Sequence, residues 1–121
     1  MSRKGLLIVV SAPSGAGKTT LCKEISRVLP NLQHSVSYTT RKPRPNETDG
    51  VHYFFVTQEK FDKMIKDKEF AEWAVVHGNL YGTSKKQLAE MMDGGIDVIL
   101  DIDSQGEMQI KENWESVAFI Y

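Results

Sequence analysis

Apolar residues recur along the chain with two different spacings. Short, nearly unbroken apolar runs predict buried strands, which lie at residues 6–10, 96–103 and 117–121. Helical spacing of apolar residues predicts helices, which lie at 18–29, at 57–68, after Ser84, and from 104 to about 113. Strands that alternate with helices in this way indicate an α/β fold with a mostly parallel sheet.

Residues 34–56 break this alternation. Their β-branched content predicts two short strands, 35–40 and 51–56, on either side of an irregular basic loop. Residues 69–78 are expected to form an irregular entry into a short strand.

A helix start is expected at Ser84, because Ser84 and Gln87 have the spacing of a capping box. In a capping box each of the two side chains bonds to the backbone N–H of the other residue. Gly94 and Gly95 are expected to end this helix, since glycine is the preferred residue just past a helix C-terminus.

The turn after the first strand has the composition of a phosphate-binding loop. Gly15 and Gly17 let backbone N–H groups approach phosphate oxygens, and the N-terminus of the next helix favours the same anion. Lys18 supplies a charge for the outer phosphates, and the Thr19 hydroxyl is suited to Mg²⁺. Alanine stands where the usual pattern has its first glycine, and this smallest substitute should still let the loop close. The predicted ATP phosphate-binding residues are Ala12, Pro13, Ser14, Gly15, Ala16, Gly17, Lys18, Thr19 and Thr20.

An acidic residue ends the second apolar run. Val98, Ile99 and Leu100 lead directly into Asp101, which describes a buried strand whose carboxyl end presents an acid at the ligand-binding edge of the sheet. An acid in this position orients Mg²⁺ or its waters, so Asp101 and Thr19 are the expected metal ligands.

A second group of cations lies in the loop between the two short strands. Arg41 and Arg44 are separated and followed by prolines, which stiffen the loop and reduce the entropy lost on binding. Guanidinium forks suit a phosphate monoester better than flexible lysines do. Because phosphoryl transfer between nucleotides needs two phosphate sites that face each other, this loop is the expected acceptor site.

Composition limits the remaining possibilities. The chain has 121 residues, enough for one domain, and a formal net charge of -1, which argues against nucleic acid or anionic membranes as partners. Its one cysteine, Cys22, cannot form an internal disulfide. There is no signal-peptide pattern and no apolar stretch of about 20 residues, so a cytoplasmic location is expected. The sequence leaves the oligomeric state open, a homo-oligomer included.

Several motifs together resemble one family. In chain order they are 12–18 (APSGAGK), 35–37 (SVS), 39–44 (TTRKPR), 78–83 (GNLYGT) and 101–106 (DIDSQG). With these motifs the chain is similar to guanylate kinase from about Leu6 to Tyr121. The resemblance implies a three-layer P-loop kinase fold, with a core formed by residues 1–34 and 84–121 and an inserted GMP-binding subdomain at 35–83.

The resemblance also implies an activity and a set of site residues. Guanylate kinases transfer the terminal phosphate of ATP to GMP with Mg²⁺, so GMP and ATP are the expected substrates and Mg²⁺ the expected cofactor. By resemblance, the guanine is bound by Ser37, Glu72, Thr83 and Asp103, and the GMP phosphate by Arg41, Arg44, Tyr53 and Tyr81. Gly82, between Tyr81 and Thr83, is also expected to bind GMP. Lys18, Arg41 and Arg44 are the residues expected to act in catalysis.

The chemistry of guanine makes the two acids sensible on independent grounds. Guanine presents N1–H and an exocyclic amine as adjacent donors, and carboxylates at Glu72 and Asp103 can accept from both. Adenine has an acceptor at N1 and would leave a carboxylate facing a lone pair. A desolvated site of this kind could discriminate by about 10⁴ or more.

The family's lid arginines and adenine-binding segment would fall beyond Tyr121. The chain is therefore expected to be an incomplete domain that binds GMP but turns over poorly, because losing an arginine that stabilises the transferring phosphate costs about 10³ to 10⁵ in rate.

Two alternatives remain. A small P-loop kinase could instead act on a ribose phosphate such as ribose 1,5-bisphosphate, although Glu72 and Asp103 favour guanine. A non-catalytic guanylate-kinase-like module could bind a phosphorylated peptide, although such modules have a degraded nucleotide loop and this chain retains Lys18, Thr19 and Asp101.

Overall fold

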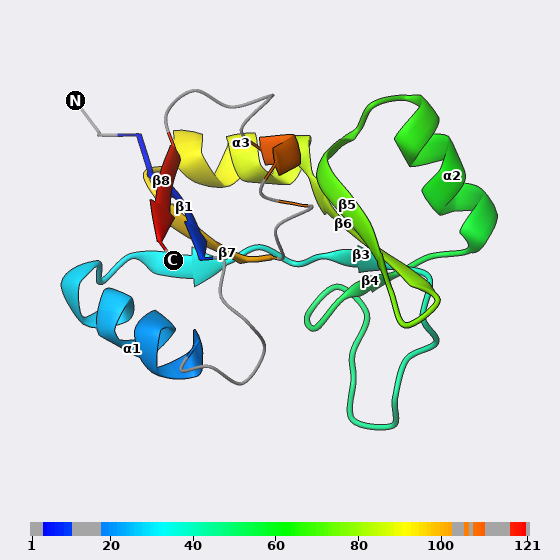
Figure 1. Cartoon of the computed structure of the whole chain (residues 1–121), viewed down its shortest axis with the longest axis horizontal. Coiled ribbons are helices and arrows are strands. Elements are labelled where there is room, and N and C mark those ends of the chain that lie inside the picture. The colour runs from blue at the N-terminus through cyan, green and yellow to red at the C-terminus, as the bar shows by residue number, and fades with distance from the viewer. Residues whose placement is uncertain (1–3, 11–17, 103–105, 107, 111–116, 121) are drawn as a thin grey trace. The chain divides into compact units, whose positions relative to one another are not determined.

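The computed structural model describes residues 4–10, 18–102, 106, 108–110 and 117–120, and at 18–22, 101 and 117–120 the backbone alone. The chain forms two compact units (Figure 1). We call Met1–Ser35 with Leu88–Tyr121 the core unit, and Val36–Gln87 the inserted unit. The inserted unit interrupts the core unit once in the chain.

The core unit contains a parallel four-stranded sheet, which we call sheet A. Its strands are β1 (Leu7–Val10), β2 (Leu32–His34), β7 (Asp97–Asp101) and β8 (Val117–Ile120), in the order β2-β7-β1-β8. All three pairings are parallel, and the register places Val10 beside Asp101. The ends of β1 and β7 therefore lie side by side at the carboxyl edge of sheet A.

Both faces of the two central strands are buried. Ile8, Val10 and Ile99 share one face, where Ile25 and Leu29 from the end of α1 pack against them. Alternate residues of β1 and β7 point to the opposite face, and these are equally buried: Leu7, Val9, Val98 and Leu100. Figure 1 shows α1 (Lys18–Val28) and α3 (Lys85–Asp93) on opposite sides of these strands. The unbroken apolar runs of β1 and β7 follow from this double coverage.

The inserted unit contains a mixed four-stranded sheet, sheet B, and one helix. The strands are β3 (Tyr38–Thr39), β4 (Phe54–Phe55), β5 (Phe70–Val76) and β6 (Asn79–Ser84), in the order β4-β3-β6-β5. Strands β3 and β4 are parallel, whereas β3 with β6 and β5 with β6 are antiparallel. The helix is α2 (Gln58–Lys66), which begins after β4 and leads into β5.

Helix α2 covers one face of sheet B. Its N-cap residue Thr57 accepts a hydrogen bond from the Lys60 backbone N–H at 3.1 Å. The buried side chains of Phe61 and Met64 pack with Phe70, and the rings of Phe61 and Phe70 are 4.5 Å apart. This cluster leaves the other face of sheet B without a helix among the described elements of the inserted unit.

The predicted α/β fold with a parallel sheet is confirmed, and the strands and helices expected from apolar spacing are present at 7–10, 18–28, 58–66, 85–93, 97–101 and 117–120. Strand β2 was not predicted, because Leu32 is the one apolar residue in its three positions. Of the helix expected at 104–113, the described residues 106 and 108–110 are helical.

An irregular entry into a short strand was predicted at 69–78. The structure has strand β5 there, with a register shift between Phe70 and Glu72 at its start, and β5 connects to β6 through a two-residue turn at His77 and Gly78. Both turn residues have positive φ, 50° and 80°, as a tight hairpin of this kind requires. Apart from one irregularity, the strand is continuous, so the hairpin is held by pairing that the local sequence does not signal.

The predicted capping box at the start of α3 is half formed. The Gln87 backbone N–H donates to the Ser84 hydroxyl at 3.2 Å, as expected. The Gln87 side chain instead accepts from the Val36 N–H at 2.6 Å and donates to the Val36 carbonyl at 2.9 Å. A distant backbone segment therefore takes the place of the second capping bond and closes the two ends of the inserted unit together.

Candidate phosphate and guanine site

The face of sheet B opposite α2, together with the loop 40–53, carries most of the residues predicted to bind GMP. Successive residues of a strand point to opposite faces, and paired residues point to the same face. The register thus groups Tyr38, Phe54, Trp73 and Gly82 on the face toward α2, and groups Thr39, Phe55, Glu72, Tyr81 and Thr83 on the opposite face. We call this opposite face, with the loop 40–53 at its end, the acceptor face.

Arg41 is fixed at the start of this loop by four hydrogen bonds from its guanidinium. Nε donates to the Tyr81 hydroxyl at 3.3 Å, and Nη1 donates to the Lys42 carbonyl at 3.0 Å. Nη1 and Nη2 donate to the two carboxylate oxygens of Glu47, each at 2.9 Å. Arg41 is thereby held in one orientation, on the acceptor face.

Glu47 forms a two-oxygen fork with Arg41 that is largely shielded from water. The side chains of Arg41 and Glu47 are 14% and 15% exposed. Oε1 of Glu47 also accepts from the Arg44 backbone N–H at 2.8 Å. The hydrogen bonds from the Arg41 side chain, and then the one from the Arg44 backbone, lower the pKa of Glu47 to about 2. The same fork, followed by the bond to Tyr81, raises the pKa of Arg41.

Aromatic rings line one side of the Arg41 guanidinium. Its central carbon lies 5.2 Å from the centre of the Tyr53 ring and 6.0 Å from that of Phe55. The Tyr53 ring meets the Tyr81 ring edge to face at 5.9 Å. Cation–π attraction and the Tyr81 hydrogen bond act together, so Arg41, Tyr53 and Tyr81 form one cluster.

Glu72 and Thr83 form a second cluster on the acceptor face. Between Phe70 and Glu72 the pairing of β5 with β6 shifts its register, and this irregularity places Glu72 opposite Thr83. The Thr83 hydroxyl donates to Glu72 Oε1 at 2.6 Å, and the two residues are 1% and 6% exposed. A carboxylate this buried needs such partners, because burial of an unpaired charge is costly.

The remaining predicted residues of the inserted unit lie around these clusters. Ser37 directly precedes β3, and its carbonyl oxygen accepts a hydrogen bond from the Phe54 backbone N–H at 2.9 Å. Gly82 lies between Tyr81 and Thr83, where an added Cβ would lie 2.7 Å from a Phe70 ring carbon. Gly82 therefore packs against the apolar cluster between sheet B and α2. Its part in binding GMP stays a prediction.

Arg44 differs from Arg41 in its contacts. Its backbone N–H bonds to Glu47, and its carbonyl accepts from the Glu47 backbone N–H at 3.0 Å. The Arg44 side chain is exposed, and its guanidinium has no hydrogen-bond partner among the residues that the structure describes. The turn thus holds the Arg44 backbone in place while its charged group faces solvent.

The predicted ATP and metal residues lie outside the described residues, in whole or in part. They comprise the loop residues Ala12, Pro13, Ser14, Gly15, Ala16 and Gly17, the side chains of Lys18, Thr19, Thr20 and Asp101, and Asp103. The backbone does place Asp101 at the end of β7, beside the last residue of β1, at the same edge as the loop that follows β1. Among the described side chains, no group of three or more His, Cys, Asp or Glu residues could hold a metal ion.

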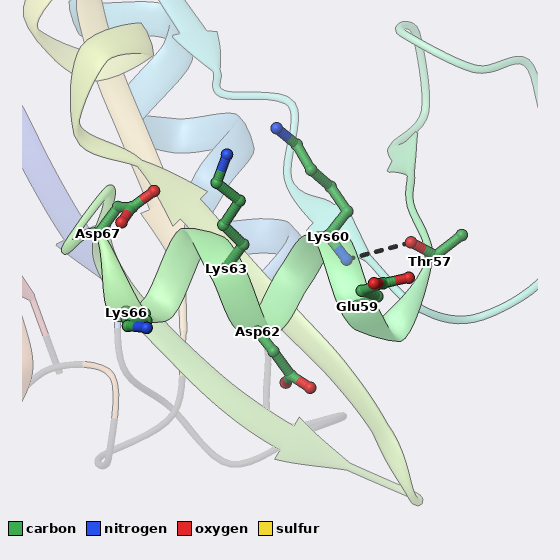
Figure 2. Close-up of a pocket in the computed structure, with 7 residues that line it drawn as sticks. All are labelled: Thr57, Glu59, Lys60, Asp62, Lys63, Lys66 and Asp67. Atoms are coloured by element: carbon green, nitrogen blue, oxygen red, sulfur yellow. Dashed lines mark hydrogen bonds between the residues drawn. The ribbon is translucent and has the colours of Figure 1, made fainter.

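A separate hollow of about 660 Å³ lies along α2. Figure 2 shows its lining, which comes from one helix and its ends: Thr57, Glu59, Lys60, Asp62, Lys63, Lys66 and Asp67. Three cations and three carboxylates balance in this lining, and none of its residues is a predicted site residue. Across the described part of the chain, no helix is long and apolar enough to cross a membrane.

Glu47 is the residue of this site that sequence reasoning missed. The available signal was its spacing, three residues after Arg44 and six after Arg41 in an otherwise basic loop. A turn brings residues three apart within hydrogen-bonding distance, so an acid at this position could have been assigned as a partner of the arginines.

A parallel α/β core and an inserted mixed sheet define the class of protein, a P-loop kinase fold. The guanylate kinase family model matches residues 4–121, and the chain belongs to the guanylate kinase family. The curated relatives include guanylate kinases of Geobacter metallireducens, 56% identical over 121 residues, and Rickettsia bellii, 48% identical over 118 residues.

These matches cover nearly all of this chain and part of each relative. They span 100% and 98% of this chain and 60% and 62% of the two relatives, so the chain spans about 60% of the length of its curated relatives. The crystal structure of guanylate kinase from Anaplasma phagocytophilum is similar, with a TM-score of 0.74, 36% identity, 98% of this chain covered and 60% of that chain.

Proposed function

We propose that the protein transfers the γ-phosphate of ATP to GMP, giving ADP and GDP. The observation that carries this proposal is the acceptor face, which collects Arg41, two tyrosines and a buried carboxylate–threonine pair, with Arg44 in the adjoining loop. Its two clusters complement the two parts of a nucleoside monophosphate. The arginine and tyrosine cluster suits the anionic phosphate, and the carboxylate–threonine cluster suits a base with adjacent donors. The family relationship supports the same reaction.

The acceptor phosphate would be held by Arg41, Arg44, Tyr53 and Tyr81. Guanidinium groups bind phosphate through charge-assisted hydrogen bonds, and the tyrosine hydroxyls add donors that carry no charge. Holding the acceptor oxygen in one place contributes to catalysis, because phosphoryl transfer depends on positioning and electrostatic stabilisation.

The guanine would be bound by Glu72, Thr83 and Ser37 and, as the family resemblance implies, by Asp103. Glu72 presents a buried carboxylate that already accepts one hydrogen bond from Thr83. A base that donates from N1–H and from an exocyclic amine suits a carboxylate in this position, whereas adenine would present a lone pair to it. This asymmetry is the proposed source of the preference for GMP over AMP.

The ATP phosphates would be held by the loop residues 12–20, with Lys18 as the charged contact. The parallel register that puts Asp101 at the edge beside the end of β1 suits a metal ligand, and Thr19 follows the loop in the chain. These two residues would hold Mg²⁺, which, when bound, neutralises charge on the transferred phosphate. A cytoplasmic setting is part of this proposal, since a lone cysteine suits a reducing compartment.

The test is ADP release from Mg-ATP by the protein at its full natural length, with GMP, AMP or ribose 1,5-bisphosphate as acceptor. We expect release with GMP at least about 10³-fold faster than with AMP. Glu72→Gln should reduce this ratio, because the amide presents a donor where guanine needs an acceptor, while Glu69→Gln serves as a matched control on an exposed carboxylate three residues away. Faster release with ribose 1,5-bisphosphate than with GMP would contradict the proposed function, and so would the absence of release with either nucleotide.

A further inference from the structure

The two arginines of the acceptor face are not equivalent in this structure. A guanidinium carries five N–H donors. Four of those on Arg41 are engaged by Tyr81, Lys42 and Glu47, which leaves one N–H on Nη2 for a ligand. The guanidinium of Arg44 has all five available with respect to the described residues.

Glu47 connects the two arginines. Its side chain binds the Arg41 guanidinium through both oxygens and the Arg44 backbone through one of them. Its own N–H closes the turn on the Arg44 carbonyl. One carboxylate therefore sets the direction of the Arg41 side chain and the position of the Arg44 main chain.

The charges of the loop also distinguish the two arginines. Arg41 and Glu47 cancel each other at close range, so the positive charges of this segment that lack a paired carboxylate among the described residues are Lys42 and Arg44. Arg44, with a planar fork of donors, is the better match for a phosphate of these two.

We propose that Glu47 is a positioning residue of the acceptor phosphate site. It holds the Arg41 side chain in one orientation and fixes the turn that carries Arg44, the principal phosphate-binding arginine. This inference rests on the proposed function and deepens it. Glu47 acts through the arginines and makes no contact with the substrate, because its two oxygens are directed at cationic and N–H donors and a phosphate would repel them.

The test measures binding of GMP and of guanosine by isothermal titration, with the protein at its full natural length. Guanosine lacks the phosphate and so reports on the base site alone. For Glu47→Gln we expect GMP affinity to fall about tenfold or more, because the amide replaces one acceptor with a donor that faces Arg41, while guanosine affinity changes less than about twofold. Glu59→Gln, the same chemical change at an exposed carboxylate of α2, should change neither affinity.

The arginines give the second measurement. Arg44→Lys keeps the charge but loses the planar fork of donors. With both substitutions made in the Glu47→Gln protein, Arg44→Lys should weaken GMP binding more than Arg41→Lys does. In turnover with saturating ATP, Glu47→Gln should raise the KM for GMP and also lower kcat, because a positioned acceptor phosphate contributes both to binding and to transfer.

Several outcomes separate the two proposals. Unchanged or tighter GMP binding by Glu47→Gln would overturn the positioning role, and so would an equal loss for GMP and guanosine, which would show a general structural effect. In each of those cases wild-type binding of GMP would leave the proposed function standing. Failure of the wild-type protein to bind GMP more tightly than guanosine would overturn both.

Discussion

Replacing Gly82 with alanine tests how the acceptor face depends on the core behind it. An added Cβ would lie 2.7 and 2.8 Å from two ring carbons of Phe70 and 3.1 Å from the ring of Phe61. These distances are too short for carbon atoms, so the sheet or the rings must move. The Phe70 ring is buried against Phe61, which limits how far it can turn aside.

The magnitude follows from two opposing effects. Overpacking of a well-packed core costs about 1–3 kcal/mol. Replacing glycine with alanine also removes freedom from the unfolded chain, which returns about 0.4–1 kcal/mol. We therefore expect Gly82→Ala to lower the free energy of unfolding by about 1.3 kcal/mol, the difference between the midpoints of these two ranges.

Urea unfolding, followed by circular dichroism, measures this change. Gly94→Ala is the matched control, because its Cβ would lie 3.4 Å from two carbonyl oxygens, an ordinary contact. The control should raise stability by about 0.4–1 kcal/mol, because it keeps the effect on the unfolded chain without the clash. Trimming the ring with Phe70→Leu should relieve part of the clash, so Gly82→Ala should cost less than half as much in that background. Equal costs in the two backgrounds would refute the overpacking argument.

Three further expectations concern the binding site. Thr83→Val should lower the free energy of unfolding by about 1.5–3 kcal/mol, because buried Glu72 loses a hydrogen bond, and Thr83→Ser should recover most of it in the same urea assay. The stability difference between wild type and Glu47→Gln should disappear as the pH falls from about 4.5 to about 2. Folding lowers the pKa of Glu47 from 4.5 to about 2, so its contribution to stability is complete above the higher value and lost below the lower one. A difference that persists at pH 2 would show that the fork with Arg41 is not its source. Lys18→Ala should abolish ADP release while GMP affinity measured by titration stays within about twofold, and a large loss of GMP binding would mean that the two phosphate sites have been confused.

Local patterns in the sequence predicted much of the fold. Strands buried on both faces are mostly apolar, so β1 and the centre of β7 at Val98–Leu100 appear in the sequence as apolar runs. Helix α2 shows Phe61 and Met64 on one side and charges elsewhere, which follows from having one covered face. Motifs with fixed spacing likewise predicted most of the candidate site residues, because resemblance preserves the order of residues along a chain.

Tertiary contacts decided the rest. The pairing of β5 with β6 shifts its register between Phe70 and Glu72, and that shift brings Glu72 opposite Thr83. The second half of the predicted capping box is replaced because the backbone of Val36, 51 residues away, offers Gln87 two hydrogen bonds. Such pairings depend on chain segments that meet only after folding.

The sequence by itself determined that the chain is an α/β protein of the guanylate kinase family with two arginines in a stiff loop, since residue type and spacing are local properties. Only the tertiary structure decided how those arginines differ. Glu47, the Tyr81 hydroxyl and the Lys42 carbonyl together engage four of the five donors of Arg41, while the fork of Arg44 stays exposed, and this follows from hydrogen-bond geometry across a turn and a neighbouring strand. A linear pattern of charges records which groups are present, and the directions of their donors are set when the chain folds.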